Sequence, residues 1–325
     1  MSTVALRRAV RRRADLGIIV IAILLVAVFA TTSDGRWANF YNIASILQVT
    51  ATLGLMTLGV ALVIGTGEID ISVGSTFGMG ALVYLWLADN LDPAGALVAA
   101  LGVGLLIGFA NGWLVTRTKT PSLIVTLGTL MIFRGIAIAL TGGFSFSVPY
   151  ANRGHPVYQV VGGGELFGLN VAVPWLVVLL IVLSVLVFAT PLGNRLLAVG
   201  GSAVSAHSRG VRVDRVKLFA FLMSGLLAAL GGALEAGKLG FADGSMGRLM
   251  ELQAIAACVL GGCALAGGRI SLVGAVLGAF VLSSIQSYLV VMGVRPQWFI
   301  LLLGLIVVFA ALGDKMLRGW ALKRF

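Results

Sequence analysis

The stretch Ile43–Ile64 reads IASILQVTATLGLMTLGVALVI and contains no charged residue. A helix needs about 20 apolar residues to cross a hydrocarbon core about 30 Å thick, so this stretch predicts a membrane-spanning helix. Similar blocks occur at Leu16–Ala30, Leu176–Ala189 and Trp298–Leu312. Of the 325 residues, 59% are hydrophobic and 11% are charged, whereas soluble domains carry about 25% charged residues. The composition therefore excludes a soluble enzyme.

The apolar runs predict an all-α, polytopic helical bundle of about ten spans, forming one membrane domain over 1–325. The arginine-rich start resembles a signal peptide, but no convincing small-residue cleavage site follows. It is interpreted as a cytoplasmic arm (1–15) before an uncleaved first helix. The spans are expected near 16–32, 43–65, 71–88, 94–116, 120–141, 172–191, 216–237, 251–267, 270–292 and 296–313.

Topology explains the net charge of +11 better than nucleic-acid binding does. The basic residues form short clusters between spans, without the interleaved aromatic residues of a nucleic-acid surface. With the N-terminus inside, the predicted cytoplasmic segments hold 17 of the 23 Lys and Arg. This asymmetry follows the positive-inside rule, and an even number of spans then places both termini in the cytoplasm.

Two predicted loops are unusually long. The outer loop over 142–171 is rich in glycine, proline and aromatic residues, and the inner loop over 192–215 is basic, with small residues spaced as in a short amphipathic helix. Long loops are often functional. Each loop is therefore a candidate docking surface, and an ordinary connector is the alternative for both.

The segment Gly65–Ser75, GTGEIDISVGS, interrupts the apolar pattern with glycines, hydroxyls and two carboxylates. Charged groups at membrane depth usually face a cavity, a partner or water, and glycines let a helix unwind there. Glu68, Asp70, Ser72 and Ser75 are therefore candidates for the translocation pathway. The alternative is a plain cytoplasmic turn in which both carboxylates are solvated.

This segment also resembles the hallmark of permeases of the ribose/galactose/xylose class of ABC importers. The resemblance continues in order along the chain, through Asn111–Val115 (NGWLV), Thr120–Thr129 (TPSLIVTLGT), Gly200–Val211 (GGSAVSAHSRGV), and Glu251–Ala257 (ELQAIAA) with Gly261–Gly268 (GGCALAGG). The sequence departs from the family pattern in four places: Glu68, Ser202, the pair Cys263–Ala264 and the region Ser284–Ser287. These departures put the identity of the solute in doubt more than the class.

The resemblance implies a permease subunit that moves a monosaccharide or sugar-like solute across the bacterial inner membrane. ATP and magnesium would bind a separate cytoplasmic ATPase, with no cofactor on this chain. The other implied partners are a periplasmic substrate-binding protein, membrane lipid and a second permease chain, identical or related. The loop that resembles the ATPase-coupling region offers Gly200, Gly201, Ser202, Ala206, Gly210 and Val211.

Three polar residues inside predicted spans complete the pathway candidates: Asn111, Thr126 and Arg134. For Arg134, the alternative to a pathway role is a side chain that extends to the membrane interface. For Asn111, the alternative is a hydrogen bond between helices. The pairs Gly74/Gly78 and Gly274/Gly278 have the spacing of close helix packing, which includes contact with a second subunit. Gly67 precedes Gly74 by the same number of residues as Gly267 precedes Gly274. This equal spacing favours an internal duplication.

No pattern indicates catalysis. Gly232–Lys238 matches the start of a phosphate-binding loop, but Leu239 stands where serine or threonine should bind magnesium. Cys258 and Cys263 lie in an apolar segment and have no metal-site or disulfide-framework pattern. Besides the importer, two hypotheses remain open: a proton-coupled secondary transporter that uses Glu68, Asp70 or Arg134, and a membrane scaffold or receptor that moves no solute.

Overall fold

The computed structural model describes residues 3–88, 92–147 and 154–322, and the side chains within 17–309 of these ranges. Helices dominate, with short strands in the connecting segments. The helices are α1 (Thr3–Thr32), α2 (Phe40–Gly65), α3 (Val73–Ala88), α4 (Pro93–Thr118), α5 (Ser122–Thr141), α6 (Pro156–Tyr158), α7 (Ala172–Ala189), α8 (Pro191–Gly201), α9 (Ala203–Ser208), α10 (Val213–Leu239), α11 (Met250–Leu260), α12 (Leu272–Val291) and α13 (Gln297–Leu322).

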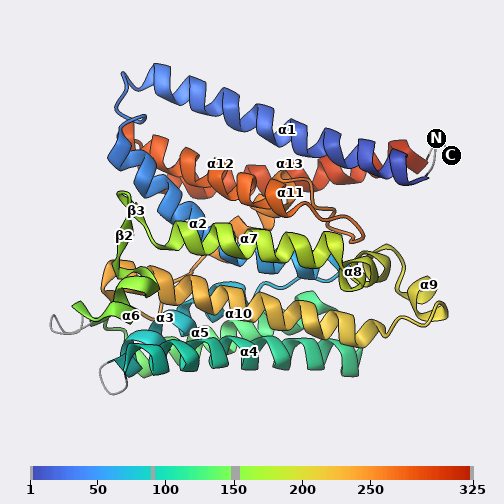
Figure 1. The fold of residues 1–325 in the computed structure, drawn as a ribbon, viewed down its shortest axis with the longest axis horizontal. Coiled ribbons are helices and arrows are strands. Elements are labelled where there is room, and N and C mark those ends of the chain that lie inside the picture. Colours follow the sequence, from blue (N-terminus) through green and yellow to red (C-terminus); the bar gives the residue numbers. More distant parts are fainter. Residues whose placement is uncertain (1–2, 89–91, 148–153, 323–325) are drawn as a thin grey trace.

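The long helices run nearly parallel to one axis (Figure 1). Within the described residues, six are long and apolar enough to cross a membrane, namely α2, α4, α5, α7, α10 and α12. Four shorter apolar helical segments, in α1, α3, α11 and α13, fall at the other predicted spans. The prediction of an all-α, polytopic membrane protein is confirmed, while the number ten and the direction of the termini stay predictions.

The eighth predicted span is wrong in length. A helix over 251–267 was expected, but α11 ends at Leu260. Gly262, Gly267 and Gly268 all have positive φ, a conformation that glycine adopts without the steric cost other residues meet. The segment after α11 is therefore an irregular loop over 261–271 that leads back to α12.

The core of the bundle is built on α2 and α10. Nearly nine-tenths of the apolar window of α2 is buried within this one chain, and α10 packs on α2, α3 and α4. Glycines bring these backbones together, since a Cβ on Gly59 would lie 2.8 Å from Ser224 Cα and one on Gly104 would collide with the carbonyl of Gly225. Small residues permit such close approach between membrane helices.

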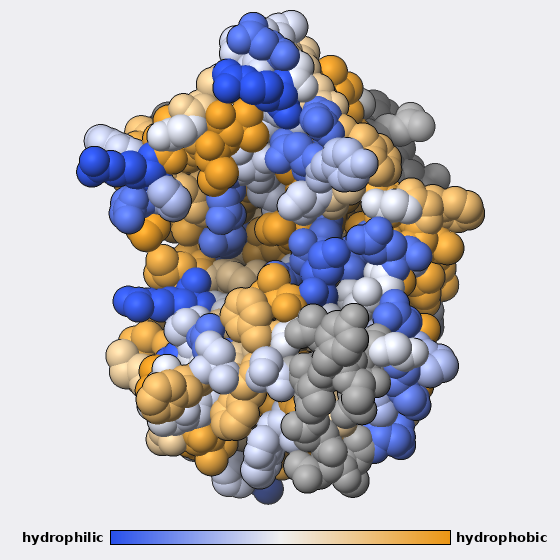
Figure 2. All heavy atoms as spheres, turned by 90° about the vertical axis from the view of Figure 1, so that its left-hand side faces the viewer, coloured by the Kyte–Doolittle hydropathy of each residue, from blue (hydrophilic) through white to orange (hydrophobic). Residues whose placement is uncertain are grey.

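The two ends of the bundle differ. The α8–α9 end carries α8, α9, the start of α1 and the end of α13 (Figure 1). The opposite end carries α6, a π-helical turn (Gln159–Gly163) and two strand pairs, β1 (Phe146–Ser147) with β4 (Phe241–Ala242) and β2 (Glu165–Leu166) with β3 (Leu169–Asn170). Hydrophilic side chains cover much of this second end (Figure 2). The predicted outer loop over 142–171 lies here, and its residues 148–153 fall outside the described ranges.

Candidate functional site

Three segments from distant parts of the chain meet at the α8–α9 end: the loop 66–72 after α2, the last residues of α8, and the loop 261–271. The Gly268 amide donates to the Gly65 carbonyl oxygen over 3.1 Å. A Cβ on Gly200 would collide with the Gly65 carbonyl and lie 2.5 Å from the Gly268 amide nitrogen. The backbones therefore touch directly, and we call this contact the glycine junction.

The two loops at the junction share a local form. Gly67 has φ +84° and Gly267 has φ +85°, and a Cβ on Gly267 would lie 2.7 Å from the amide nitrogen of Gly67. In each case a buried helix ends, the chain turns at a positive-φ glycine, and a new helix begins after Ser72 or Ser271. The repeated motif that the sequence shows thus corresponds to two loops that pack on each other.

A buried polar network holds the first loop in place. Asp70 accepts hydrogen bonds from the Ser72 amide (3.0 Å), the Ser72 hydroxyl (2.7 Å) and the Ser224 hydroxyl of α10 (2.8 Å). Asn111 of α4 donates to Ser72 Oγ over 2.7 Å. Burial raises the pKa of the Asp70 carboxyl, and the hydrogen bonds from Ser72 and Ser224 lower it in part. Asp70 is thus not a solvated turn residue.

Two further contacts attach the same loop to its neighbours. Glu68 forms an ion pair with Lys217 of α10, and both side chains are mostly buried. The Ile69 amide donates to Ser122 Oγ over 3.0 Å, and Thr126 Oγ1 donates to the Ile69 carbonyl over 3.3 Å. The loop 66–72 is therefore bound to α4, α5 and α10 as well as to the glycine junction.

The structure brings together six of the seven pathway candidates and separates the seventh. Glu68, Asp70, Ser72, Ser75, Asn111 and Thr126 all lie in or against the loop 66–72. Arg134 lies toward the other end of α5, where its guanidinium donates to the carbonyls of Met246 and Gly244. That contact fixes the segment between β4 and α11, and a pathway role for any of the seven stays a prediction.

The glycine pairs pack inside the chain. A Cβ on Gly74 would collide with Glu251, and one on Gly78 would lie 2.7 Å from the Met246 carbonyl. A Cβ on Gly274 would collide with the Gly261 carbonyl, and one on Gly278 with the Ala257 carbonyl. The first pair therefore lets the start of α11 and the segment before it pack closely on α3. The second pair lets the C-terminal end of α11 pack closely on α12.

The predicted coupling loop forms two short helices. Ser202 ends α8 and caps α9, accepting from the Ser205 amide over 3.2 Å. Ala206 is buried, and the Val211 amide donates to its carbonyl over 3.1 Å, which closes α9 before the positive-φ residue Gly210. Gly200 points into the glycine junction, whereas nothing lies within 4 Å of a Cβ on Gly201. The face of the α8–α9 element that carries Gly200 is therefore packed against the bundle, and the face that carries Gly201 is open.

Sequence reasoning missed three partners of this site: Ser122, Lys217 and Ser224. A lone serine in an apolar helix usually bonds to its own backbone, so Ser224 gave no sign that it would donate to Asp70. In the sequence, Lys217 indicates only the orientation of the chain in the membrane, as one of the basic residues of a predicted cytoplasmic segment. Glu251, quoted only within a motif, is buried with one carboxylate oxygen unpartnered among the described residues.

Residues 42–311 match the sequence model of the permease component of the branched-chain amino acid transport system. The chain belongs to this family. The permease is 35% identical over 305 residues to an autoinducer 2 import system permease protein, LsrC, of Yersinia enterocolitica, covering 93% of this chain and 83% of that one. It is 32% identical over 358 residues to the xylose transport system permease protein XylH of Escherichia coli, covering 91% of each. No solved structure matches the permease.

Proposed function

We propose that this chain is the membrane permease subunit of an ABC importer for a monosaccharide or sugar-like solute in the bacterial inner membrane. Its relatives include permeases that are named for autoinducer 2 import and for xylose transport. Those names support the solute class. Energy would come from ATP hydrolysis on a separate ATPase that binds ATP and magnesium. A second permease chain and a periplasmic binding protein would complete the importer.

One observation carries the mechanism: the backbone of Gly200 in α8 packs directly on Gly65, the last residue of α2, and on Gly268 of the loop 261–271. The described Lys and Arg at the α8–α9 end include Arg117, Arg195, Arg209 and Arg269, so the positive-inside rule favours a cytoplasmic position for this end. An ATPase bound on α9 and the open face at Gly201 would then act on both loops at once.

The mechanical step follows from packing. Glycine backbones in direct contact leave no flexible side chain to absorb a displacement, and tightly packed interiors transmit strain. A shift of α8 would therefore move the ends of α2 and α11, whose loops lead into α3 and α12. The bonds of Asp70 and Glu68 would keep the first loop attached to α10, and the bond between Ser72 and Asn111 would keep it attached to α4, while the junction moves.

Reconstitution tests the function. The permease would be placed in proteoliposomes with its ATPase and binding protein, and uptake of xylose, ribose, galactose and autoinducer 2 would be measured with and without ATP. ATP-dependent uptake of at least one of these solutes supports the proposal. Uptake by the permease alone, driven by a proton gradient, would instead establish the secondary transporter.

A further inference from the structure

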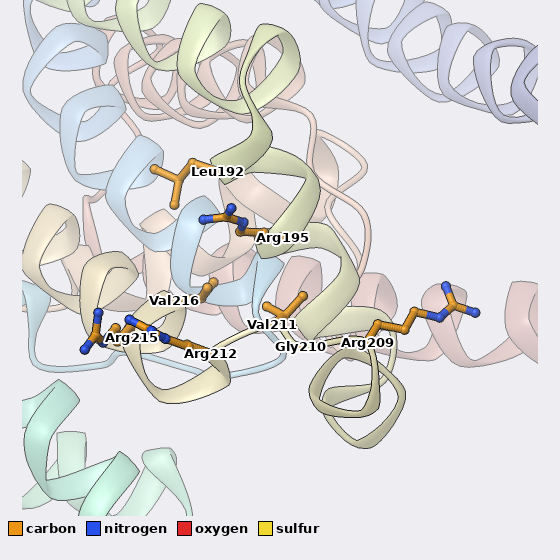
Figure 3. Close-up of a pocket in the computed structure, with 8 residues that line it drawn as sticks. All are labelled: Leu192, Arg195, Arg209, Gly210, Val211, Arg212, Arg215 and Val216. Atoms are coloured by element: carbon orange, nitrogen blue, oxygen red, sulfur yellow. The ribbon is translucent and has the colours of Figure 1, made fainter.

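A basic pocket opens at the α8–α9 end between α8 and the start of α10 (Figure 3). Its volume is about 560 Å³, and its walls are Leu192, Arg195, Arg209, Gly210, Val211, Arg212, Arg215 and Val216. Four of these eight residues are arginines, and none is acidic. Such a cavity concentrates positive charge beside apolar side chains.

The arginines of the basic pocket lack a counter-ion among the side chains that the structure describes. Within the described residues, no ion pair involves any of the four. The nearby carboxylates are engaged elsewhere, Asp214 with Lys119 and Glu68 with Lys217. Arg212 and Arg215 lie at the start of α10, where the helix dipole is positive and adds to their charge. Among the described side chains no ion pair offsets their mutual repulsion, so an anion bound in the pocket would relieve it.

The side chains differ in direction. Arg212 and Arg215 lie next to each other, and Arg195 extends from α8 over the same cavity, whereas Arg209 points away from it (Figure 3). Guanidinium groups bind phosphate oxygens through paired N–H donors, which suits them to phosphate more than to a simple halide. Three residues therefore form the anion site, and Arg209 serves as an internal control.

We propose that the basic pocket binds a phosphate group carried by an anionic phospholipid of the cytoplasmic leaflet. The pocket lies where two apolar spans end, since α7 stops at Ala189 and the apolar part of α10 begins after Lys217. This is the level of lipid headgroups. The apolar walls at Leu192, Val211 and Val216 suit the glycerol region of a lipid, and basic pockets between spans bind anionic headgroups.

The test uses the full chain, purified and placed in nanodiscs of phosphatidylcholine with rising fractions of phosphatidylglycerol. Retained lipid would be counted by native mass spectrometry for the wild type, R212Q/R215Q, R212K/R215K and R209Q. The Gln pair should weaken retention of phosphatidylglycerol by about fivefold per arginine, since each basic residue near an anionic surface contributes about 1 kcal/mol. The Lys pair should retain most of it, and R209Q should resemble the wild type.

Three results would overturn the proposal. Equal retention by R212Q/R215Q and the wild type would remove the lipid from the pocket. Displacement of the lipid by inorganic phosphate, with no preference for phosphatidylglycerol, would make the ligand a soluble phosphate. Unchanged lipid retention with lost ATPase binding would assign the arginines to the ATPase surface. Because lipid retention is measured without an ATPase, its failure leaves the proposed transport function standing.

Discussion

The amide of Gly268 donates a hydrogen bond to the carbonyl oxygen of Gly65, at 3.1 Å, between two segments that are far apart in the sequence. The last carbonyls of a helix have no partner inside it, and here the loop after α11 supplies one for the end of α2. The backbone of Gly200 packs directly beside this hydrogen bond. The element proposed to receive the ATPase is therefore in contact with the end of α2 and with the loop that follows α11.

The glycine junction predicts different outcomes for two adjacent glycines. Gly200→Ala would force its methyl group into the Gly65 carbonyl, whereas Gly201→Ala would meet open space. Overpacking of this kind typically costs about 1–3 kcal/mol. Gly200→Ala should therefore lower the thermal stability in detergent and reduce ATP-driven uptake, with Gly201→Ala as the matched control for stability. Equal behaviour of the two variants would mean that the junction has no such role.

The Asp70 network predicts a coupled loss of stability. Asp70→Asn replaces the carboxylate oxygen that accepts from Ser224 or Ser72 by an amide nitrogen, and Ser224→Ala removes the donor, so each disturbs the same buried network at a cost of up to about 1–3 kcal/mol. Because both act on one bond, the double variant should lose less than the sum of the single losses. Thermal unfolding of the four proteins measures this directly. Asp92→Asn, at the exposed cap of α4, is the control, and strict additivity would contradict the network.

The Glu68–Lys217 pair predicts rescue by charge exchange. Glu68→Lys or Lys217→Glu alone places two like charges together in a mostly buried position, so each single variant should lose up to roughly 3–5 kcal/mol of stability. The double exchange should recover part of that loss. The same exchange at Lys119 and Asp214, which are largely exposed, should change stability by less than about 1 kcal/mol.

Arg134 predicts a local effect at the opposite end of α5. Arg134→Lys keeps the charge but loses the planar group that reaches Met246 and Gly244. Amide exchange over 241–249 should therefore become faster, while exchange over 66–72 stays unchanged. A proton-coupling role would give a different result, since Arg134→Lys would then alter the pH dependence of uptake without affecting exchange in this segment.

Some of this architecture could be predicted from the sequence, and some could not. Apolar blocks such as Ile43–Ile64 mark the helices because a bilayer demands long runs of apolar residues. The early end of α11 was missed because Gly262 and Gly267 were counted within an apolar run. The difference between Gly200 and Gly201 depends on Gly65 and Gly268, which only tertiary packing brings near. Ser224 and Lys217 could not be predicted as partners of Asp70 and Glu68 for the same reason.

The central claim is that the α8–α9 element of this permease binds an ATPase. The most direct measurement is purification of the tagged chain from its native membrane in mild detergent, with partners identified by mass, for the wild type and Gly201→Asp. Gly201 lies on the open face, so the substitution should leave the fold intact. We expect a stoichiometric ATPase with the wild type and its loss from Gly201→Asp. Repeated absence of an ATPase from the wild type, or undiminished binding and uptake with Gly201→Asp, would contradict it.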